Sequence, residues 1–145
     1  MIEGVIIKDL RTHHDERGFF REIFRFPSEF SGIPVGQVSH SFVNEGVIKG
    51  WHGHKYQAQW NYVVTGKIKV VLFDNREDSA TFKELMEFYI GEGEESQAYY
   101  FPKGVLHGYQ CLIAPMNIIY VTSGVFDLKD EERISLDNQS INYHW

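Results

Sequence analysis

The sequence has 145 residues, 43% hydrophobic and 23% charged, which is enough for one buried core of ordinary size. Its net charge of −6 and the lack of any lysine- or arginine-rich block argue against a nucleic-acid partner, and no apolar run reaches the length of a membrane span. The single cysteine, Cys111, excludes an internal disulfide and favours a reducing, cytoplasmic location. These totals predict a single cytoplasmic domain over residues 1–145.

Short runs rich in β-branched and aromatic residues recur along the chain between Gly and Asn turns. The predicted strands cover residues 5–10, 19–25, 35–43, 47–52, 59–74, 85–91, 97–101, 108–113 and 117–123. Within 59–74, Thr65-Gly66 indicates a hairpin turn. Helix is favoured only around residues 27–30, with Ser28 as a candidate cap. The pattern predicts an all-β sandwich or small barrel, and an immunoglobulin-like sandwich lacks its Cys…Trp…Cys signature.

Two histidines stand one residue apart in GWHGH, residues 50–54. Residues two apart on a strand point the same way, so His52 and His54 are expected to share one face while Trp51 and Gly53 take the other. A third histidine, His107, follows a Pro-x-Gly turn in PKGVLHG, residues 102–108. Three imidazoles can hold a metal, transfer protons, or serve as structural side chains with satisfied hydrogen bonds.

The spacing of these segments resembles the two motifs of the cupin family. The matching positions are Gly46, His52, His54, Gln59 and Gly66 in the first motif and Pro102, Gly104 and His107 in the second. In that family both motifs send side chains into the mouth of one small jelly-roll β-barrel. Metal-binding members have Glu where this chain has Gln59, and a neutral amide cannot balance a dication, so a three-histidine metal site is expected to be weak.

Longer segments are similar, in order, to the dTDP-4-dehydrorhamnose 3,5-epimerase family, which are metal-free cupins. The segments are DERGFFREIFR (15–25), QVSHS (37–41), KGWH (49–52), DNREDSATF (74–82) and PKGVLHGY (102–109). The resemblance implies a nucleotide-sugar substrate, no cofactor, and His52 as the base that removes a proton beside a 4-keto group. It also implies Asp137 as the carboxylate paired with that base, and a homodimer in which the Arg17 segment reaches the partner's pocket.

The same resemblance implies the substrate contacts. They are Arg17, Glu22 and Lys49 toward the nucleotide diphosphate, with Gln37, Gln59 and Tyr109 as further polar groups of the pocket. The chain departs from the family at two positions that affect the chemistry. Gln59 occupies the position of a family lysine. The position of the family's opposite-face tyrosine lies near Val125-Phe126, where no side chain donates a proton. Gln59 can hydrogen-bond a developing oxyanion but supplies no charge.

The dTDP-sugar 3,4-ketoisomerases, also cupins, offer a second resemblance. They carry a His-x-His-Lys segment followed by Gln, as in His52-Gly-His54-Lys55 and Gln59, and a tail similar to SGVFDLKDEERISLDN, residues 123–138. In such enzymes a histidine pair carries a proton between adjacent carbons on one face of the sugar. No opposite-face tyrosine is then needed.

The predicted function is therefore a nucleotide-sugar epimerase or ketoisomerase. Histidine has the unperturbed pKa best suited to proton transfer near neutral pH, so His52 is expected to be the base, with His54 or His107 as donor or relay. The predicted catalytic set is His52, His54, His107 and Asp137. Two alternatives are a metal-dependent cupin that uses the three histidines and a non-catalytic sugar-binding cupin. The large aromatics Trp51, Trp60, Phe19 and Phe20 are expected in the core, and Cys111 is expected to be buried and inert.

Overall fold

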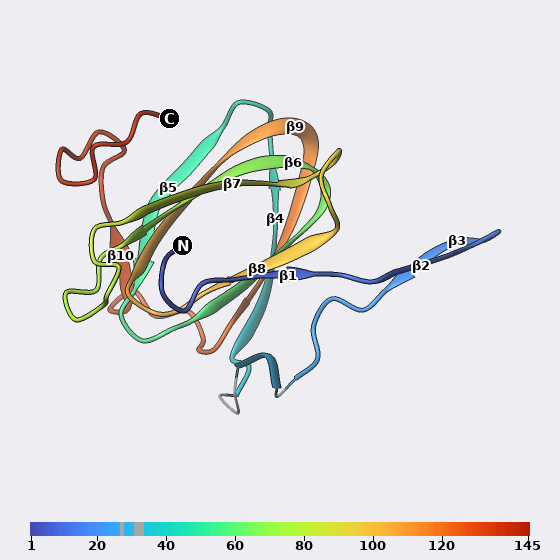
Figure 1. Ribbon diagram of the computed structural model, residues 1–145, viewed down its shortest axis with the longest axis horizontal. Helices are drawn as coiled ribbons and strands as arrows, with labels where there is room; N and C mark the ends of the chain where they lie inside the picture. Colours follow the sequence, from blue (N-terminus) through green and yellow to red (C-terminus); the bar gives the residue numbers. More distant parts are fainter. Residues whose placement is uncertain (27, 31–33) are drawn as a thin grey trace.

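The computed structural model describes residues 1–26, 28–30 and 34–145. Their regular secondary structure is almost entirely β (Figure 1), as the sequence predicts. The strands are β1 (Ile6–Asp9), β2 (Thr12–Asp15), β3 (Gly18–Arg21), β4 (Gln37–Val43), β5 (Ile48–His54), β6 (Gln59–Asp74), β7 (Leu85–Gly91), β8 (Gln97–Phe101), β9 (Val105–Thr122) and β10 (Glu131–Arg133). A short 3-10 helix, η1 (Ser28–Phe30), lies where helix was predicted; Pro27 and the side chain of Ser28 are outside the described part.

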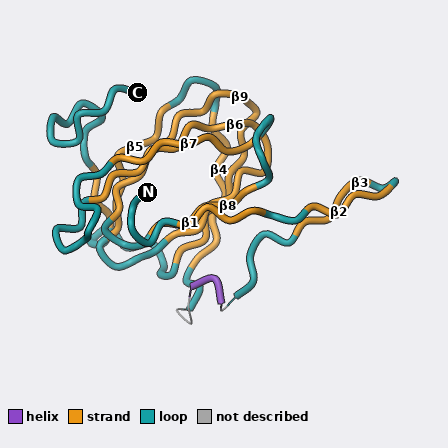
Figure 2. The backbone as a smooth tube through the Cα atoms, in the orientation of Figure 1, coloured by secondary structure: helices purple, strands orange, loops and turns teal. Residues whose placement is uncertain are grey.

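Two long antiparallel strands, β6 and β9, form the centre of one eight-stranded sheet, and each contributes to both of its layers. The first part of β6 pairs with the last part of β9 and with β8, and β8 pairs with β1. The last part of β9 also pairs with β4. The second part of β6 pairs with the first part of β9 and with β7. The first part of β9 also pairs with β5, and β5 pairs with β10. The two layers wrap around a common interior (Figure 2) and form the small jelly roll expected of a cupin.

The hairpin predicted at Thr65-Gly66 is wrong. The chain runs straight through as β6, and the pairing with β9 shifts register on either side of Thr65 and Lys67. Gly66 has φ +78°, and a Cβ there would lie 2.3 Å from the carbonyl oxygen of Ile113. Glycine is therefore needed for a bulge that lets one strand pass from layer to layer, not for a turn. The two strands predicted over 108–113 and 117–123 likewise join into β9.

Apolar side chains from both layers fill the interior. The central cluster contains fully buried members of β6 and β9, among them Ile68, Leu72, Met116 and Ile118. Trp51 packs in a separate cluster on the other face of β5, beside Val71 and Phe73. Trp51, Trp60 and Cys111 are buried as predicted. At about 25 cal/mol per Å² of apolar surface, such burial is the main favourable term for the fold.

The β2–β3 hairpin stands apart from the barrel, as Figures 1 and 2 show. Its aromatic residues Phe19 and Phe20 are 61% and 68% exposed, so their predicted place in the core is wrong. Instead they contact His14 and His13 across the hairpin. Arg21 anchors the base of this arm by donating to the hydroxyl of Tyr62 at 2.8 Å. Within the described ranges, no helix is long and apolar enough to cross a membrane.

Candidate active site

A cavity of about 260 Å³ opens at one end of the jelly roll. Its volume is close to the lower end of the usual range for small-molecule sites, roughly 300–1,000 Å³. The lining residues come from β4, β5, β6, β9 and β10, from the loop between β5 and β6, and from the segment that leads into β10. They are Gln37, Ser39, Ser41, Lys49, His52, His54, Gln57, Gln59, His107, Tyr109, Tyr120, Thr122, Phe126, Asp127 and Glu131.

The three histidines of the two sequence motifs meet in this cavity. His52 and His54 project from β5 on the same face, and His52 is paired in register with His107 of β9. The ring centroid of His107 lies 6.1 Å from that of His52 and 5.8 Å from that of His54. Phe101 stacks on His107 with a centroid distance of 4.3 Å and supports the ring from within. Adjacent antiparallel strands thus place side chains from distant segments side by side.

His52 is the most accessible of the three imidazoles, with 40% of its side chain exposed. Burial lowers its pKa below 6.5, and the carboxylate of Glu131, 4.0 Å from Nδ1, partly offsets that effect. Arg133 donates to Glu131 at 3.0 Å and holds this carboxylate in place. His52 is therefore neutral near pH 7, with a carboxylate positioned to stabilise the imidazolium that forms when it accepts a proton.

His54 and His107 lie deeper. Nδ1 of His54 is 3.4 Å from Oδ2 of Asp130, and Asp130 is only 2% exposed. Oδ1 of Asp130 accepts a hydrogen bond from the backbone N–H of Tyr56 at 2.7 Å, while Oδ2 and the Nδ1 atoms of His54 and His107 are buried without a hydrogen-bond partner. Burial, with the neighbouring imidazoles His54 and His52, sets the pKa of His107 well below 6.5, so that ring stays neutral.

Two tyrosines form a hydroxyl pair in the same cavity. The hydroxyls of Tyr109 and Tyr120 are 2.7 Å apart. Burial raises the pKa of Tyr120, although its contacts with the hydroxyls of Tyr109 and Ser41 act in the opposite direction. Burial also raises the pKa of Tyr109 far above its usual value. Both phenols are therefore protonated at neutral pH and able to donate.

A family model described as dTDP-4-dehydrorhamnose 3,5-epimerase matches residues 1–145. The chain belongs to this family. Its members are dTDP-sugar epimerases, a class of isomerases, as the sequence predicts.

Individual relatives support the assignment over the full length. A spore coat polysaccharide biosynthesis protein of Bacillus subtilis is 42% identical, with 100% of this chain and 97% of that protein covered. A probable low-salt glycan biosynthesis epimerase of Haloferax volcanii is 34% identical, with 99% and 94% covered. The structure of a dTDP-6-deoxy-D-glucose-3,5-epimerase of Legionella pneumophila, in complex with dTDP-4-keto-L-rhamnose, matches with a TM-score of 0.88 and 27% identity, covering 99% of this chain and 79% of that one.

A dTDP sugar isomerase of Desulfovibrio desulfuricans gives a TM-score of 0.89 at 26% identity, covering 99% of this chain and 92% of that one. The match covers nearly the whole of each chain, so the similarity extends over the whole barrel.

In this epimerase-family chain, most of the predicted site residues come together. The cavity brings His52, His54 and His107 together with four predicted contacts, Gln37, Lys49, Gln59 and Tyr109. Within the described residues, no three or more His, Cys, Asp or Glu side chains are grouped so that they could hold a metal ion.

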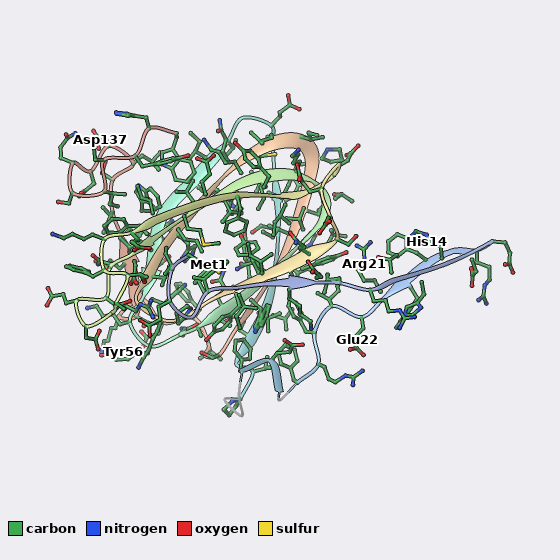
Figure 3. The ribbon with its side chains drawn as sticks, viewed as in Figure 1. Met1, His14, Arg21, Glu22, Tyr56 and Asp137 are labelled. Carbon is green, nitrogen blue, oxygen red and sulfur yellow. The ribbon has the colours of Figure 1, made fainter. Side chains whose placement is uncertain are left out.

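Three predicted residues lie elsewhere. Asp137 sits on the exposed tail loop, as Figure 3 shows, and its carboxylate accepts from the hydroxyl of Ser135. Arg17 is at the tip of the β2–β3 arm, paired with Asp15, and Glu22 pairs with Arg25 at 2.9 Å beyond that arm. Asp137 does not line the cavity, and the tail around it packs with Ile141 and Trp145 against Trp51, on the face of β5 opposite to His52.

The sequence patterns did not predict two carboxylates and one phenol that lie in or beside the cavity. The carboxylates nearest to the histidines are those of Asp130 and Glu131 in the acidic run DEER, which pairs with the histidine strand as β10. Tyr120 is the second omission. It lies on the long strand shared with His107, and only the register of β9 shows that its hydroxyl meets Tyr109. The acidic run DEER, most of which forms the short strand β10, was the available signal for the carboxylates. The sequence held no comparable signal for Tyr120.

Proposed function

We propose that the protein acts, without a metal, on a dTDP-linked deoxysugar that has a 4-keto group. It moves a proton beside that ketone, which either inverts the neighbouring carbon or shifts the ketone to it. The observation that carries this proposal is the convergence of a neutral imidazole, His52, and a protonated phenol, Tyr120, in one cavity. A 4-keto sugar needs a base of pKa near neutrality to remove an adjacent proton and a donor to return it. The cavity supplies both.

In the first step His52 removes the proton from the carbon next to the ketone. Its Nδ1 faces Glu131, which leaves Nε2 for the substrate and places a carboxylate near the positive charge that forms. The electrons of the broken C–H bond move onto the ketone oxygen as an enolate. Neutral hydrogen-bond donors of the lining, including Gln59 and the buried His107, then stabilise that oxygen.

In the second step a proton returns to the carbon. If Tyr120 delivers it from the face opposite to His52, the centre is inverted and Tyr120 is left as a phenolate. Its hydroxyl contact with Tyr109, at 2.7 Å, stabilises that charge until a proton is recovered. If His54 or His107 returns the proton to the former ketone carbon on the same face, and the proton of the C3 hydroxyl passes to the C4 oxygen, the outcome is a ketoisomerisation.

We also propose that the working unit is a homodimer in the reducing cytoplasm. Among the lining residues that the structure describes, Lys49 is the one lysine or arginine, whereas Asp127 and Glu131 are both acidic. A diphosphate needs further positive charge. The exposed arm carries Arg17 at its tip, and a lone two-stranded hairpin is marginally stable in water, so this arm is expected to dock on a second copy near its cavity.

Proton NMR in deuterated water tests the reaction. The protein is incubated with dTDP-4-keto-6-deoxyglucose, and deuterium entry at C3 and C5 is followed together with the appearance of new isomers. Epimerisation gives deuterium at one or both carbons in an inverted sugar, and ketoisomerisation gives a 3-keto product. Tight binding of the nucleotide sugar with no exchange at either carbon would leave only a binding protein.

Mixing two inactive variants tests the dimer. Arg17→Ala is expected to weaken substrate binding and His52→Asn to remove the base. If the arm serves the partner's cavity, a mixed dimer contains one intact site, and activity returns when the two purified variants are exchanged and mixed. A mixture that stays as inactive as its components contradicts the shared site.

A further inference from the structure

A β-bulge in β5 lies between Lys49 and His52. In the pairing of β5 with β9, Lys49 stands opposite Tyr109 and His52 stands opposite His107, so three steps along β5 match two steps along β9. Residues three apart on a regular strand point to opposite faces, yet the side chains of Lys49 and His52 both line the cavity. The bulge is therefore the feature that lets one strand present a cation and a base to the same ligand.

The indole of Trp145 covers this bulge from the side opposite to the cavity, where it packs with Trp51. Gly108 is the residue of β9 that faces the bulge, and a Cβ on it would lie 2.7 Å from the indole of Trp145. A Cβ on Gly50, within the bulge, would lie 3.3 Å from that indole and 3.0 Å from Cα of Gly108. Neither glycine has a positive φ. Glycine is needed at both positions because the two strands and the indole approach one another closely.

The segment after β10 holds Trp145 and the bulge together. Backbone groups of Trp51 and Ile134 exchange two hydrogen bonds, of 3.2 and 3.0 Å. The indole of Trp145 packs on that of Trp51 at a centroid distance of 5.1 Å, and the ammonium of Lys69 lies 5.6 Å from the centroid of the Trp145 ring. Nε1 of Trp145 is buried without a hydrogen-bond partner, so packing and the nearby cation fix the position of this ring.

We infer that Trp145 is a positioning residue that holds the bulge in β5 and thereby keeps Lys49 and His52 on one face of the strand at a fixed spacing. This inference rests on the function proposed above, in which Lys49 meets the diphosphate and His52 the sugar, and adds a role for a residue outside the cavity. A change of register by one residue would turn one of the two side chains away from the cavity. Even a displacement of about 1 Å from the productive geometry can slow a reaction about 10²-fold.

Trp145→Ala is the direct test in the deuterium-exchange assay. It is expected to lower kcat/KM by about 10²-fold, through slower proton removal at His52 and weaker binding at Lys49. Titration calorimetry should show that the same variant binds dTDP more weakly than the unmodified protein does. Trp145→Phe should recover most of both losses, since a phenyl ring still fills part of the space above the two glycines.

Phe73→Leu is the matched control for a loss of packing. Phe73 is 4% exposed and belongs to the same cluster as Trp51, but it lies on β6. The variant should melt at a lower temperature, whereas well below that temperature its kcat and its affinity for dTDP should be unchanged. Equal losses of activity in Phe73→Leu and Trp145→Ala would show general destabilisation and overturn the inference. Unchanged kinetics in Trp145→Ala would overturn it as well.

A double-mutant cycle on dTDP binding connects Trp145 with Lys49. Lys49→Ala should weaken binding, and the addition of Trp145→Ala should weaken it little further, because the bulge then has no cation to position. Losses that multiply in the double variant would mean that Trp145 does not act through Lys49.

A readout without turnover separates this inference from the proposed reaction. In ¹H–¹³C spectra, the imidazole signals of His52 should move in Trp145→Ala and stay in place in Phe73→Leu. Absence of exchange in the unmodified protein would remove the proposed reaction, and the imidazole signals and the affinity for dTDP would still decide the role of Trp145. If neither responds to Trp145→Ala, the positioning role is removed, whatever the reaction proves to be.

Discussion

Two buried polar clusters in this protein are built in opposite ways. At the end of β6, the carboxylate of Asp74, 0% exposed, accepts hydrogen bonds from Arg76, Ser79 and Thr81 in the loop that follows. Arg76 also donates to the carbonyl oxygen of Glu3 at 2.7 Å, which ties the N-terminal segment to the loop. Burial alone would raise the pKa of Asp74, but these hydrogen bonds hold it far below its usual value.

Several buried polar atoms in and beside the histidine cavity make no hydrogen bond. They are Nδ1 of His54 and Oδ2 of Asp130, which face each other at 3.4 Å, Nδ1 of His107, and Nδ2 of Asn61 next to Gln59. A saturated cluster has one stable arrangement and contributes to stability, whereas a cluster with free donors and acceptors can bind a ligand or move a proton. The contrast agrees with a structural role for the Asp74–Arg76 ion pair and with the proposal that the chemistry takes place in the cavity.

Among variants of the histidine cavity, His52→Asn is expected to have the largest effect on the rate of deuterium exchange. Removal of the proposed base should slow deuterium exchange by about 10³-fold, the middle of the range for general acid–base catalysis. The melting temperature should change little, because His52 is partly exposed and makes no buried hydrogen bond. His40→Asn is the matched control: His40 bonds Asn117 on an exposed part of the sheet. Equal exchange rates for the two variants would contradict the role of His52.

Asp74→Asn tests the fully hydrogen-bonded cluster around Asp74. One member of a buried ion pair is removed, so the free energy of unfolding should fall by about 3–5 kcal/mol, measured by urea denaturation. Turnover per folded molecule should not change. Because the pKa of Asp74 is lower in the folded state, its contribution is complete above the unfolded pKa of about 3.9 and fades as the pH falls toward the folded value. The two stability curves should therefore converge in acid.

Tyr120→Phe should separate proton removal from inversion. If Tyr120 returns the proton to the opposite face, the variant should form inverted product about 10²-fold more slowly. Exchange of the substrate proton through His52 should persist, since the base is intact. NMR measures both rates in one sample. Full inversion by the variant would assign the second proton transfer to another group.

The smallest effect concerns pH. His52 must be neutral to act as a base, so kcat/KM should fall as the pH drops through its pKa, and burial places that acid limb below 6.5. Glu131 raises this pKa, so Glu131→Gln should move the limb to still lower pH. A pH–rate profile of both proteins in the exchange assay provides the measurement. A shift toward higher pH in the variant would mean that Glu131 does not act on the base.

Local patterns predicted the strands better than the turns. Residues 85–91 and 97–101 become β7 and β8 as expected, since alternating apolar residues bounded by turn signals are a local property. Thr65-Gly66 was misread because a glycine with positive φ serves a hairpin or a bulge equally well. Phe19 and Phe20 were misplaced in the core because their hydrophobicity does not reveal that the hairpin leaves the barrel.

The sequence by itself determined the all-β class and the shared face of His52 and His54, because strand alternation is written in the order of residues. That His107 joins them was implied by the resemblance to the cupin motifs, and the register of β5 and β9 places it there. Only the tertiary structure decided which carboxylates and phenols join them. Asp130, Glu131 and Tyr120 meet the histidines through strand register, and Asp137 is carried away after β10. Register depends on contacts between segments far apart in the chain, and no local pattern encodes it.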